Sequence, residues 1–117
     1  EKASNLSGGQ CQRLALARAL LHDILVYIFD EATSNIDVES ENDIMRQIHE
    51  LAKSKTVILV SHRLANVVGA DLIYVLDHGT VAESGSHEEL LSCHSLYERL
   101  RTAQQTLEQF GKECAGV

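Results

Sequence analysis

The 117-residue sequence contains no proline and no tryptophan, and only three cysteines, Cys11, Cys93 and Cys114. The cysteines are odd in number and widely spaced, with no C-x-x-C pair, which argues against a disulfide framework or a zinc ribbon. The longest uninterrupted apolar run, Ile24 to Phe29, has six residues, whereas a membrane-spanning helix needs roughly 20. The sequence therefore contains no candidate transmembrane helix, and any link to a membrane must come from other segments.

Basic residues are also scarce. Ten Lys and Arg residues oppose 17 Asp and Glu residues, so the formal net charge is −7. A surface that binds nucleic acid needs clustered cations to neutralise the phosphates, so we expect no nucleic-acid partner. The 44% content of hydrophobic residues is nevertheless enough to form the core of one domain of ordinary size.

The first half of the sequence reads as an α/β arrangement. Residues 1–10 are polar and contain glycine, which indicates a loop, and apolar positions at helical spacing predict a helix over residues 11–21. The run 24–29 is short and apolar on both alternating faces, which is typical of a strand in a sheet that is covered on both sides.

A second helix and a second strand follow. Asp37 can cap a helix that ends near Ser54, and residues 56–60 form another fully apolar run. Strand, helix and strand then make a right-handed crossover, so we expect the two strands to be parallel.

The remaining elements are predicted to be short. We expect a short helix over residues 61–69, and strands over 72–76 and 80–83 that form a hairpin at the edge of the sheet. Ser86 and Glu89 fit the capping-box pattern for a closing helix.

The predicted domain boundary falls at residue 101, where the closing helix is expected to end. Residues 1–101 then form the domain, and residues 102–117, in which the apolar density falls, form a tail that we expect to fray.

Polar side chains follow both predicted parallel strands. Asp30 and Glu31 follow the first strand, and Ser61 and His62 follow the second. Because the carboxyl ends of parallel strands share one edge, we expect these groups to converge there. Of two adjacent acids, one can hold a hard cation through water while the other accepts a proton from an attacking water, which suits phosphoryl chemistry. The blander interpretation is a solvated turn, since acids commonly follow strands.

The pentapeptide Leu6-Ser7-Gly8-Gly9-Gln10 stands immediately before the first predicted helix. Backbone N–H groups at the positive end of a helix dipole form a ready site for phosphate oxygens. The alternative is a flexible N-cap without a ligand. Average residue frequencies give this pentapeptide by chance on the order of once in ten thousand chains of this length, so chance is a poor explanation.

Four segments in this order and spacing resemble the ATP-binding cassette (ABC) ATPases. Residues 6–10 match the signature motif, 24–31 resemble the Walker B strand, 34–37 the D-loop, and 61–63 the switch-histidine loop. The resemblance runs from Glu1 to about Arg101 and implies an α/β fold: a partial P-loop NTPase-type sheet with parallel strands, flanking helices and a C-terminal edge hairpin.

The segment from Glu83 to Leu90 is most similar to the exporter branch of this family, in which the cassette follows a helical membrane domain. The resemblance therefore implies the C-terminal portion of an exporter's nucleotide-binding domain. It implies as partners a second nucleotide-binding domain and a transmembrane domain, and a location at the cytoplasmic face of the cell membrane.

The resemblance also implies catalytic roles. Asp30 would hold Mg²⁺ through water, Glu31 would polarise the hydrolytic water, and His62 would contact the γ-phosphate of ATP and link it to Glu31. ATP and Mg²⁺ are thus the implied cofactors.

Two further groups of residues are implied to act between cassettes. Ser7, Gly8, Gly9 and Gln10 of one cassette would close over ATP held by the opposite cassette, and Ser34 and Asp37 of the D-loop would lie at that dimer interface.

The sequence departs from the family in one respect that concerns activity. It contains no G-x-x-x-x-G-K-[ST] loop, and the adenine-stacking aromatic residue and the Q-loop of the family are missing. We therefore expect the isolated chain to bind ATP feebly or not at all.

Two alternative functions stay open. The chain could be a non-catalytic module that docks on an intact cassette through Leu6 to Gln10, which the missing phosphate loop motivates. It could also belong to a soluble chromosome or repair ATPase, which the absence of coiled-coil heptads and of a basic stripe disfavours.

Smaller motifs carry less weight. His87, Cys93 and His94 form the best candidate metal cluster, but His87 and His94 lie two helical turns apart, too far to share an ion without a third element. Ser61 and His62 are neighbours at a strand end, where side chains diverge, so a Ser-His-Asp hydrolase is disfavoured. Arg13 and Arg18 are expected to be solvated or paired rather than to bind phosphate.

Overall fold

The computed structural model describes residues 7–33 and 35–116, and these residues form two units whose boundary in the sequence lies between His62 and Arg63. In the part of the chain that is described, no helix is both long and apolar enough to cross a membrane.

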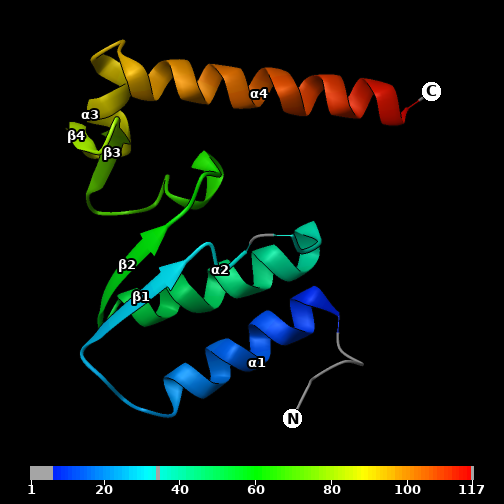
Figure 1. The fold of residues 1–117 in the computed structure, drawn as a ribbon, viewed down its shortest axis with the longest axis vertical. Helices are drawn as coiled ribbons and strands as arrows, with labels where there is room; N and C mark the ends of the chain where they lie inside the picture. Colours follow the sequence, from blue (N-terminus) through cyan, green and yellow to red (C-terminus); the bar gives the residue numbers. More distant parts are fainter. Residues whose placement is uncertain (1–6, 34, 117) are drawn as a thin grey trace. The chain divides into compact units, whose positions relative to one another are not determined.

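The first unit is a strand–helix–strand crossover preceded by a helix (Figure 1). Its elements are α1 (Gly8–Leu20), β1 (Val26–Asp30), α2 (Val38–Ala52) and β2 (Thr56–Val60). β1 pairs with β2 in parallel, with Val26 opposite Thr56 and Asp30 opposite Val60. The predicted parallel crossover is therefore confirmed.

The core of this unit lies between α1, α2 and one face of the strand pair. Ile44, Met45 and Ile48 of α2 and Leu16 of α1 are buried together. Their spacing of one and three positions places the three α2 residues on one side of that helix. Phe29, Val57 and Leu59 pack against this cluster from the strands.

The opposite face of the strand pair is open to solvent. Val26, Ile28, Ile58 and Val60 alternate with the core-facing residues, and Ile28 is 68% exposed. The expectation that the first strand is covered on both sides is thus wrong for this unit, because its two helices pack only against the face that carries Phe29 and Leu59.

α1 begins earlier than predicted. Its N-cap is Ser7 and its first residue is Gly8. Residues 8–10, which were expected to lie in a loop, therefore belong to the helix. The helix starts here because Ser7 and Gln10 form a capping box, which satisfies first-turn N–H groups and outweighs the low helix propensity of two glycines.

The second unit is a hairpin with helices packed against it. It contains η1 (Leu64–Asn66), β3 (Ile73–Asp77), β4 (Thr80–Gly85), α3 (His87–Ser92) and α4 (Leu96–Ala115). β3 pairs with β4 in antiparallel fashion, as predicted, and this pair forms a two-stranded sheet of its own. Ile73, Val75, Leu90 and Tyr97 form the core.

Two helix predictions in this unit are wrong. The helix expected over 61–69 is only the single turn of η1. The closing helix is divided between α3 and α4, at a break where His94 has a φ of 50°.

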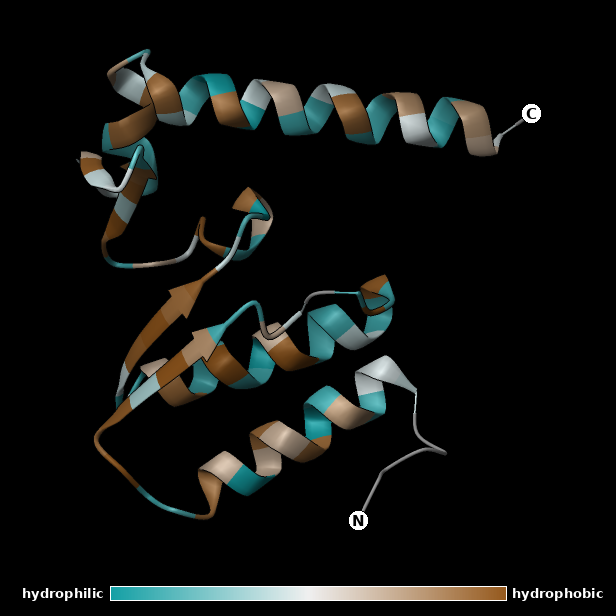
Figure 2. Cartoon of the chain, viewed as in Figure 1, coloured by the Kyte–Doolittle hydropathy of each residue, from teal (hydrophilic) through white to brown (hydrophobic). Residues whose placement is uncertain are grey.

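α4 also extends to Ala115 rather than to about Arg101. Its start is fixed by a distant residue, because the Glu83 carboxylate accepts hydrogen bonds from the N–H groups of Leu96 (3.1 Å) and Tyr97 (2.9 Å). Apolar bands continue along α4 well past residue 101 (Figure 2). A domain boundary at residue 101 and fraying of the tail stay predictions.

Candidate functional site

A carboxylate and an imidazole meet at the carboxyl edge of the parallel strand pair. Nδ1 of His62 lies 2.7 Å from Oε2 of Glu31. Glu31 directly follows β1, and His62 comes two residues after β2. The structure thus brings together the two residues for which a catalytic role is predicted, and both side chains are accessible to solvent, at 39% and 69% exposure.

The backbone at Glu31 explains this meeting. Its N–H donates to the carbonyl of Val60 (2.9 Å), which extends the strand pairing by one residue. Glu31 then adopts a φ of 53°, in the left-handed region that non-glycine residues seldom occupy. Backbone strain of this kind costs about 1 kcal/mol or more and must be held in place by its surroundings, here by the strand pairing on one side and His62 on the other.

An ionised carboxylate can only accept hydrogen bonds, so Nδ1 of His62 donates to Glu31. Nε2 of the imidazole can then donate to a further acceptor only when the ring is protonated. Oε1 of Glu31 has no hydrogen-bond partner among the described residues. One oxygen of Glu31 is therefore occupied by His62, and the other is available to a water molecule.

Asp30, the last residue of β1, is exposed, and its side chain forms no hydrogen bond or ion pair with another described residue. Carboxylate oxygens and water are the ligands that Mg²⁺ prefers, and this ion is commonly held by one or two carboxylates together with substrate phosphates. Asp30 fits such a role. Residues 7–33 and 35–116 contain no cluster of three or more His, Cys, Asp or Glu side chains that could hold a metal ion by themselves.

The signature segment forms the first turn of α1. Ser7 Oγ accepts a hydrogen bond from the N–H of Gln10 (3.2 Å), and Gln10 Oε1 accepts one from the N–H of Ser7 (3.0 Å). The S-x-x-Q spacing that signals this capping box was overlooked in the sequence. Leu6, the first residue of the motif, lies outside the described residues.

Gly8 and Gly9 allow this turn to approach the segment that leads into α2. A Cβ atom on Gly9 would lie 2.4 Å from Ser40 Oγ and 2.6 Å from Ser40 Cβ. A Cβ atom on Gly8 would lie 3.3 Å from the Asn35 carbonyl oxygen. The close approach places the first turns of the two helices side by side, which requires glycine at position 9 whatever ligand the turn binds.

Asp37 of the predicted D-loop is the N-cap of α2 and lies next to Gly9. Its Oδ2 accepts the N–H of Ser40 at 2.9 Å. This backbone hydrogen bond, the Ser40 hydroxyl and the nearby Arg13 charge lower the pKa of the Asp37 carboxyl below its usual value. Ser34, the other D-loop residue predicted to lie at an interface, is outside the described residues.

A salt bridge ties α1 to α2 beside this contact. Arg13 Nη2 lies 2.6 Å from Asp43 Oδ2, which confirms that Arg13 is a paired helix residue. Ser40 and Asp43 were not singled out in the sequence, because a contact between two helices 30 positions apart has no local signal. No hydrogen bond or ion pair joins residues 7–10 to Glu31 or His62.

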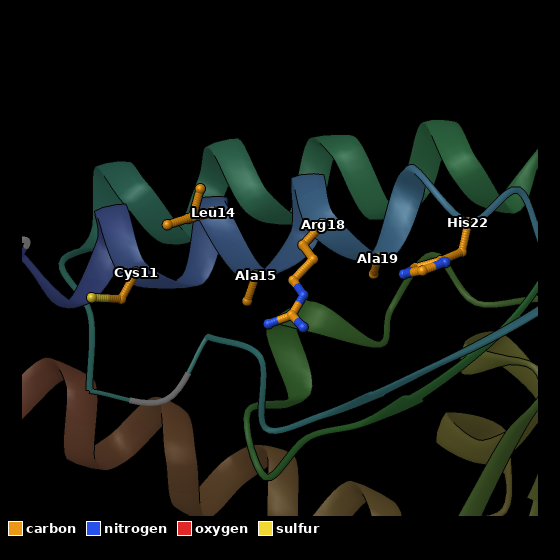
Figure 3. A pocket seen from close by; sticks show the side chains of 6 residues that line it. All are labelled: Cys11, Leu14, Ala15, Arg18, Ala19 and His22. Carbon is orange, nitrogen blue, oxygen red and sulfur yellow. The ribbon is translucent and has the colours of Figure 1, made fainter. Parts of the chain in front are cut away.

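A pocket of about 430 Å³ lies along a different face of α1 (Figure 3). Its lining residues recur at helical spacing along α1 and the turn after it: Cys11, Leu14, Ala15, Arg18, Ala19 and His22. None of them is a residue for which a catalytic or nucleotide-binding role is predicted, so this pocket is separate from the candidate site.

His87 and His94, which were considered as metal ligands in the sequence, each contact another side chain. His87 Nδ1 lies 2.9 Å from the hydroxyl of Tyr97, and His94 Nδ1 lies 2.8 Å from Glu98 Oε2. Burial raises the pKa of the Tyr97 hydroxyl. Each of these contacts holds part of the helical region in place.

The fold places the chain among α/β proteins, in which ligands bind beyond the carboxyl ends of parallel strands. Residues 1–34 match the family model described as ABC transporter. The chain is 56% identical over 108 residues to an uncharacterized ABC transporter ATP-binding protein of Haemophilus influenzae. It is 52% identical to the ATP-dependent lipid A-core flippase of Mannheimia succiniciproducens and 50% identical to the alpha-hemolysin translocation ATP-binding protein HlyB of Escherichia coli. The chain belongs to the ATP-binding domains of ABC transporters.

A solved structure agrees. A bacterial Atm1-family ABC exporter with ATP bound matches 86% of this chain with a TM-score of 0.80 and 41% sequence identity. The matches to the Haemophilus influenzae, Mannheimia succiniciproducens and Escherichia coli relatives cover 92%, 89% and 89% of this chain, respectively, but only 19%, 18% and 15% of the relatives. The chain also covers 18% of the solved exporter. It therefore spans less than a fifth of each of these proteins.

Proposed function

We propose that this chain supplies part of an ATP-hydrolysing site in an ABC exporter, whose complete protein couples ATP hydrolysis to transport across a membrane. The observation that carries this proposal is the Glu31–His62 pair, 2.7 Å apart at the carboxyl edge of two parallel strands. The flippase and translocation proteins among its relatives support the exporter class.

In this proposal Glu31 is the general base. Oε2 is held by His62, which fixes the orientation of the carboxylate, and Oε1 accepts a proton from the attacking water. With Nδ1 engaged, a protonated His62 presents Nε2–H to a phosphate oxygen and so joins the phosphate to the base.

Asp30 is proposed to hold Mg²⁺ through water, and the ion would supply charge neutralisation at the phosphates. Asp30 is the last residue of β1 and Glu31 follows it, so the two carboxylates point in different directions. This difference keeps cation binding and proton transfer separate.

Ser7, Gly8, Gly9 and Gln10 are proposed to contact a nucleotide that is held by a second nucleotide-binding domain. The Ser7 hydroxyl already accepts a hydrogen bond from Gln10, but its own proton stays free to be donated to a phosphate oxygen. Capping and phosphate binding are therefore compatible. The close approach of Gly9 to Ser40 and Asp37 would transmit a shift of this turn to Asp37, and the D-loop residues Ser34 and Asp37 are proposed to lie at the dimer interface.

The proposed partners are a second nucleotide-binding domain and a transmembrane domain, and the proposed location is the cytoplasmic face of the cell membrane. Because these 117 residues contain no G-x-x-x-x-G-K-[ST] loop, we propose that the chain by itself does not hydrolyse ATP.

The test is to measure ATP binding and turnover by the chain alone, and then after mixing it with a polypeptide that carries the phosphate loop of such a domain. We expect the chain alone to show no ATP turnover and the mixture to show Mg²⁺-dependent turnover. This turnover should be lost when the Glu31→Gln variant is used in the mixture in place of the natural chain. Turnover by the chain alone would contradict the proposal. A stable complex without turnover would favour the non-catalytic docking module instead.

A further inference from the structure

We propose that Gln104 of α4 is a positioning residue for ATP hydrolysis, because its side chain holds the backbone that directly follows His62. Gln104 Oε1 accepts a hydrogen bond from the N–H of Leu64 at 3.0 Å. Leu64 stands two positions after His62 in the sequence. The inference rests on the proposed function, since it gives Gln104 an effect on turnover that passes through His62. Gln104 escaped notice in the sequence because it falls in the tail expected over residues 102–117.

The first N–H group of η1 takes its acceptor from outside this short helix. The first N–H groups of a helix have no acceptor within the helix itself. Arg63, the N-cap of η1, makes no side-chain capping hydrogen bond, and its carbonyl accepts the N–H of Asn66 at 3.1 Å. The amide oxygen of Gln104 is therefore the cap of η1, supplied from 40 positions away. Its removal would leave the N–H of Leu64 without this acceptor in a half-buried place.

Apolar contacts hold η1 against the same core that holds α4. Leu64 and Val67 pack against the buried cluster of the second unit, which includes Tyr97 of α4. Gln104 lies seven positions after Tyr97, which is about two helical turns, and so both side chains share one face of α4. Beyond Gln104, residues 105–115 of α4 are exposed. The hydrogen bond to Leu64 thus stands at the end of the packed part of this helix.

The chain leaves His62 little freedom between two fixed points. On one side β2 ends at Val60, whose carbonyl accepts the N–H of Glu31 at 2.9 Å. On the other side Leu64 is fastened to α4 by Gln104. Consecutive Cα atoms are about 3.8 Å apart, so His62 stays within about 8 Å of each fixed point.

This restriction matters because the imidazole of His62 must stay within hydrogen-bond distance of Glu31, from which it lies 2.7 Å away. A misplacement of about 1 Å in a reacting group can lower a rate on the order of 10²-fold. Release of the backbone at Leu64 would let the His62 loop shift by such an amount. Gln104 therefore acts on the reaction through His62 and not by its own contact with the reacting atoms.

The experiment is steady-state ATP hydrolysis by the complete protein, with kcat and KM measured separately. Gln104→Met keeps the length of the side chain but removes the acceptor oxygen, so it should lower kcat by about tenfold and leave KM for ATP within about twofold. Gln104→Glu keeps an acceptor oxygen and should retain most of the activity. Gln105→Met, at the exposed neighbouring position of α4, is the matched control and should leave kcat unchanged.

A double-variant cycle with His62 distinguishes positioning from a general loss of stability. In a His62→Ala background, Gln104→Met should change kcat by less than about twofold, because the side chain that Gln104 positions is already gone. A general loss of stability would lower turnover by the same factor in both backgrounds. Amide hydrogen exchange at Leu64 should be faster in Gln104→Met than in the natural protein and unchanged in Gln105→Met.

Two sets of results overturn the inference in different ways. If Glu31→Gln and His62→Ala lose turnover but Gln104→Met keeps a normal kcat, Gln104 does not position His62 and the proposed function stands. The same conclusion follows if Gln104→Met lowers kcat equally with and without the His62 imidazole. If Glu31→Gln and His62→Ala both keep normal turnover, the proposed function fails and this inference fails with it.

Discussion

Glu31 and His62 are 31 positions apart in the sequence, yet the carboxylate and the imidazole lie within a hydrogen bond of 2.7 Å. The parallel pairing of β1 with β2 brings both strand ends to one edge, and the left-handed backbone of Glu31 directs its side chain toward the end of β2. The proposed base is thus positioned by the topology of the crossover and by one strained residue.

Glu31→Gln in the complete protein should lower steady-state ATP hydrolysis by about 10²- to 10⁴-fold and leave ATP affinity nearly unchanged. The amide keeps the shape of the side chain but cannot accept a proton from water. Turnover and equilibrium nucleotide binding are the two measurements. The matched control is Glu39→Gln in the exposed first turn of α2, which should leave both unchanged. Near-normal turnover of Glu31→Gln would remove this residue from the role of base.

His62→Ala should reduce turnover more than it reduces ATP binding, because in the proposed mechanism the imidazole orients Glu31 and contacts the phosphate during hydrolysis. His62→Gln, whose amide can still donate hydrogen bonds, should recover part of the activity. His49→Ala, on the exposed side of α2, serves as the control. An equal loss of turnover and of binding would mean that His62 acts mainly in the ground-state complex.

The sequence predicted the first unit well where the signal is local. The apolar run over residues 56–60 is β2 without any change of bounds, and Asp37 caps α2 as its position suggested. The edge that holds Glu31 and His62 followed from topology, since parallel strands joined by a crossover must end on the same side.

Contacts between distant residues were not predictable. The break before α4 depends on Glu83, which caps a helix 13 positions away, and the packing of Gly9 on Ser40 depends on how two helices approach. Neither leaves a periodic pattern. The glycines of residues 7–10 could be associated with phosphate in the sequence, but their packing role appears only in three dimensions.

Gly9→Ala should destabilise the 117-residue chain by about 1–3 kcal/mol, because the new Cβ overlaps Ser40 Cβ, which cannot rotate away. The higher helix propensity of alanine offsets part of this loss. Urea unfolding followed by circular dichroism measures the free energy of unfolding.

Ser40→Gly removes the overlapping atoms, so the double variant Gly9→Ala/Ser40→Gly should be more stable than the sum of the two single changes allows. Gly8→Ala, whose Cβ would meet its nearest neighbour at 3.3 Å, should cost less than Gly9→Ala. Strictly additive effects at Gly9 and Ser40 would show that the helices are not held at this contact.

Asp37→Asn should change how the stability of the chain depends on pH. The Ser40 hydrogen bonds hold the pKa of Asp37 below its usual value of 3.8, so the folded state binds this proton less readily than the unfolded state. Its contribution is therefore present above the unfolded pKa and is lost as pH falls through the lower, folded pKa.

Asparagine still caps the helix but does not titrate in this range. The stability difference between the natural chain and Asp37→Asn should thus be constant at neutral pH and shrink as the solution becomes more acidic than about pH 4. Urea unfolding across an acid series measures it. A difference that is independent of pH throughout would show that the carboxylate charge of Asp37 does not stabilise the fold.

Glu83→Ala should loosen α4 while leaving the first unit intact. The carboxylate of Glu83 is the acceptor for the first two N–H groups of α4, and its negative charge lies at the positive end of a 20-residue helix. Its removal should cost about 1–3 kcal/mol, and Glu83→Gln, which keeps one acceptor oxygen, should cost less.

Amide hydrogen exchange resolves the two units, and we expect faster exchange in α4 with unchanged exchange in α2. Glu88→Ala, an exposed acid in the first turn of α3, is the matched control. If exchange in α4 is the same in Glu83→Ala as in the natural chain, the start of this helix is set by the apolar contacts of Leu96 and Tyr97 rather than by the carboxylate.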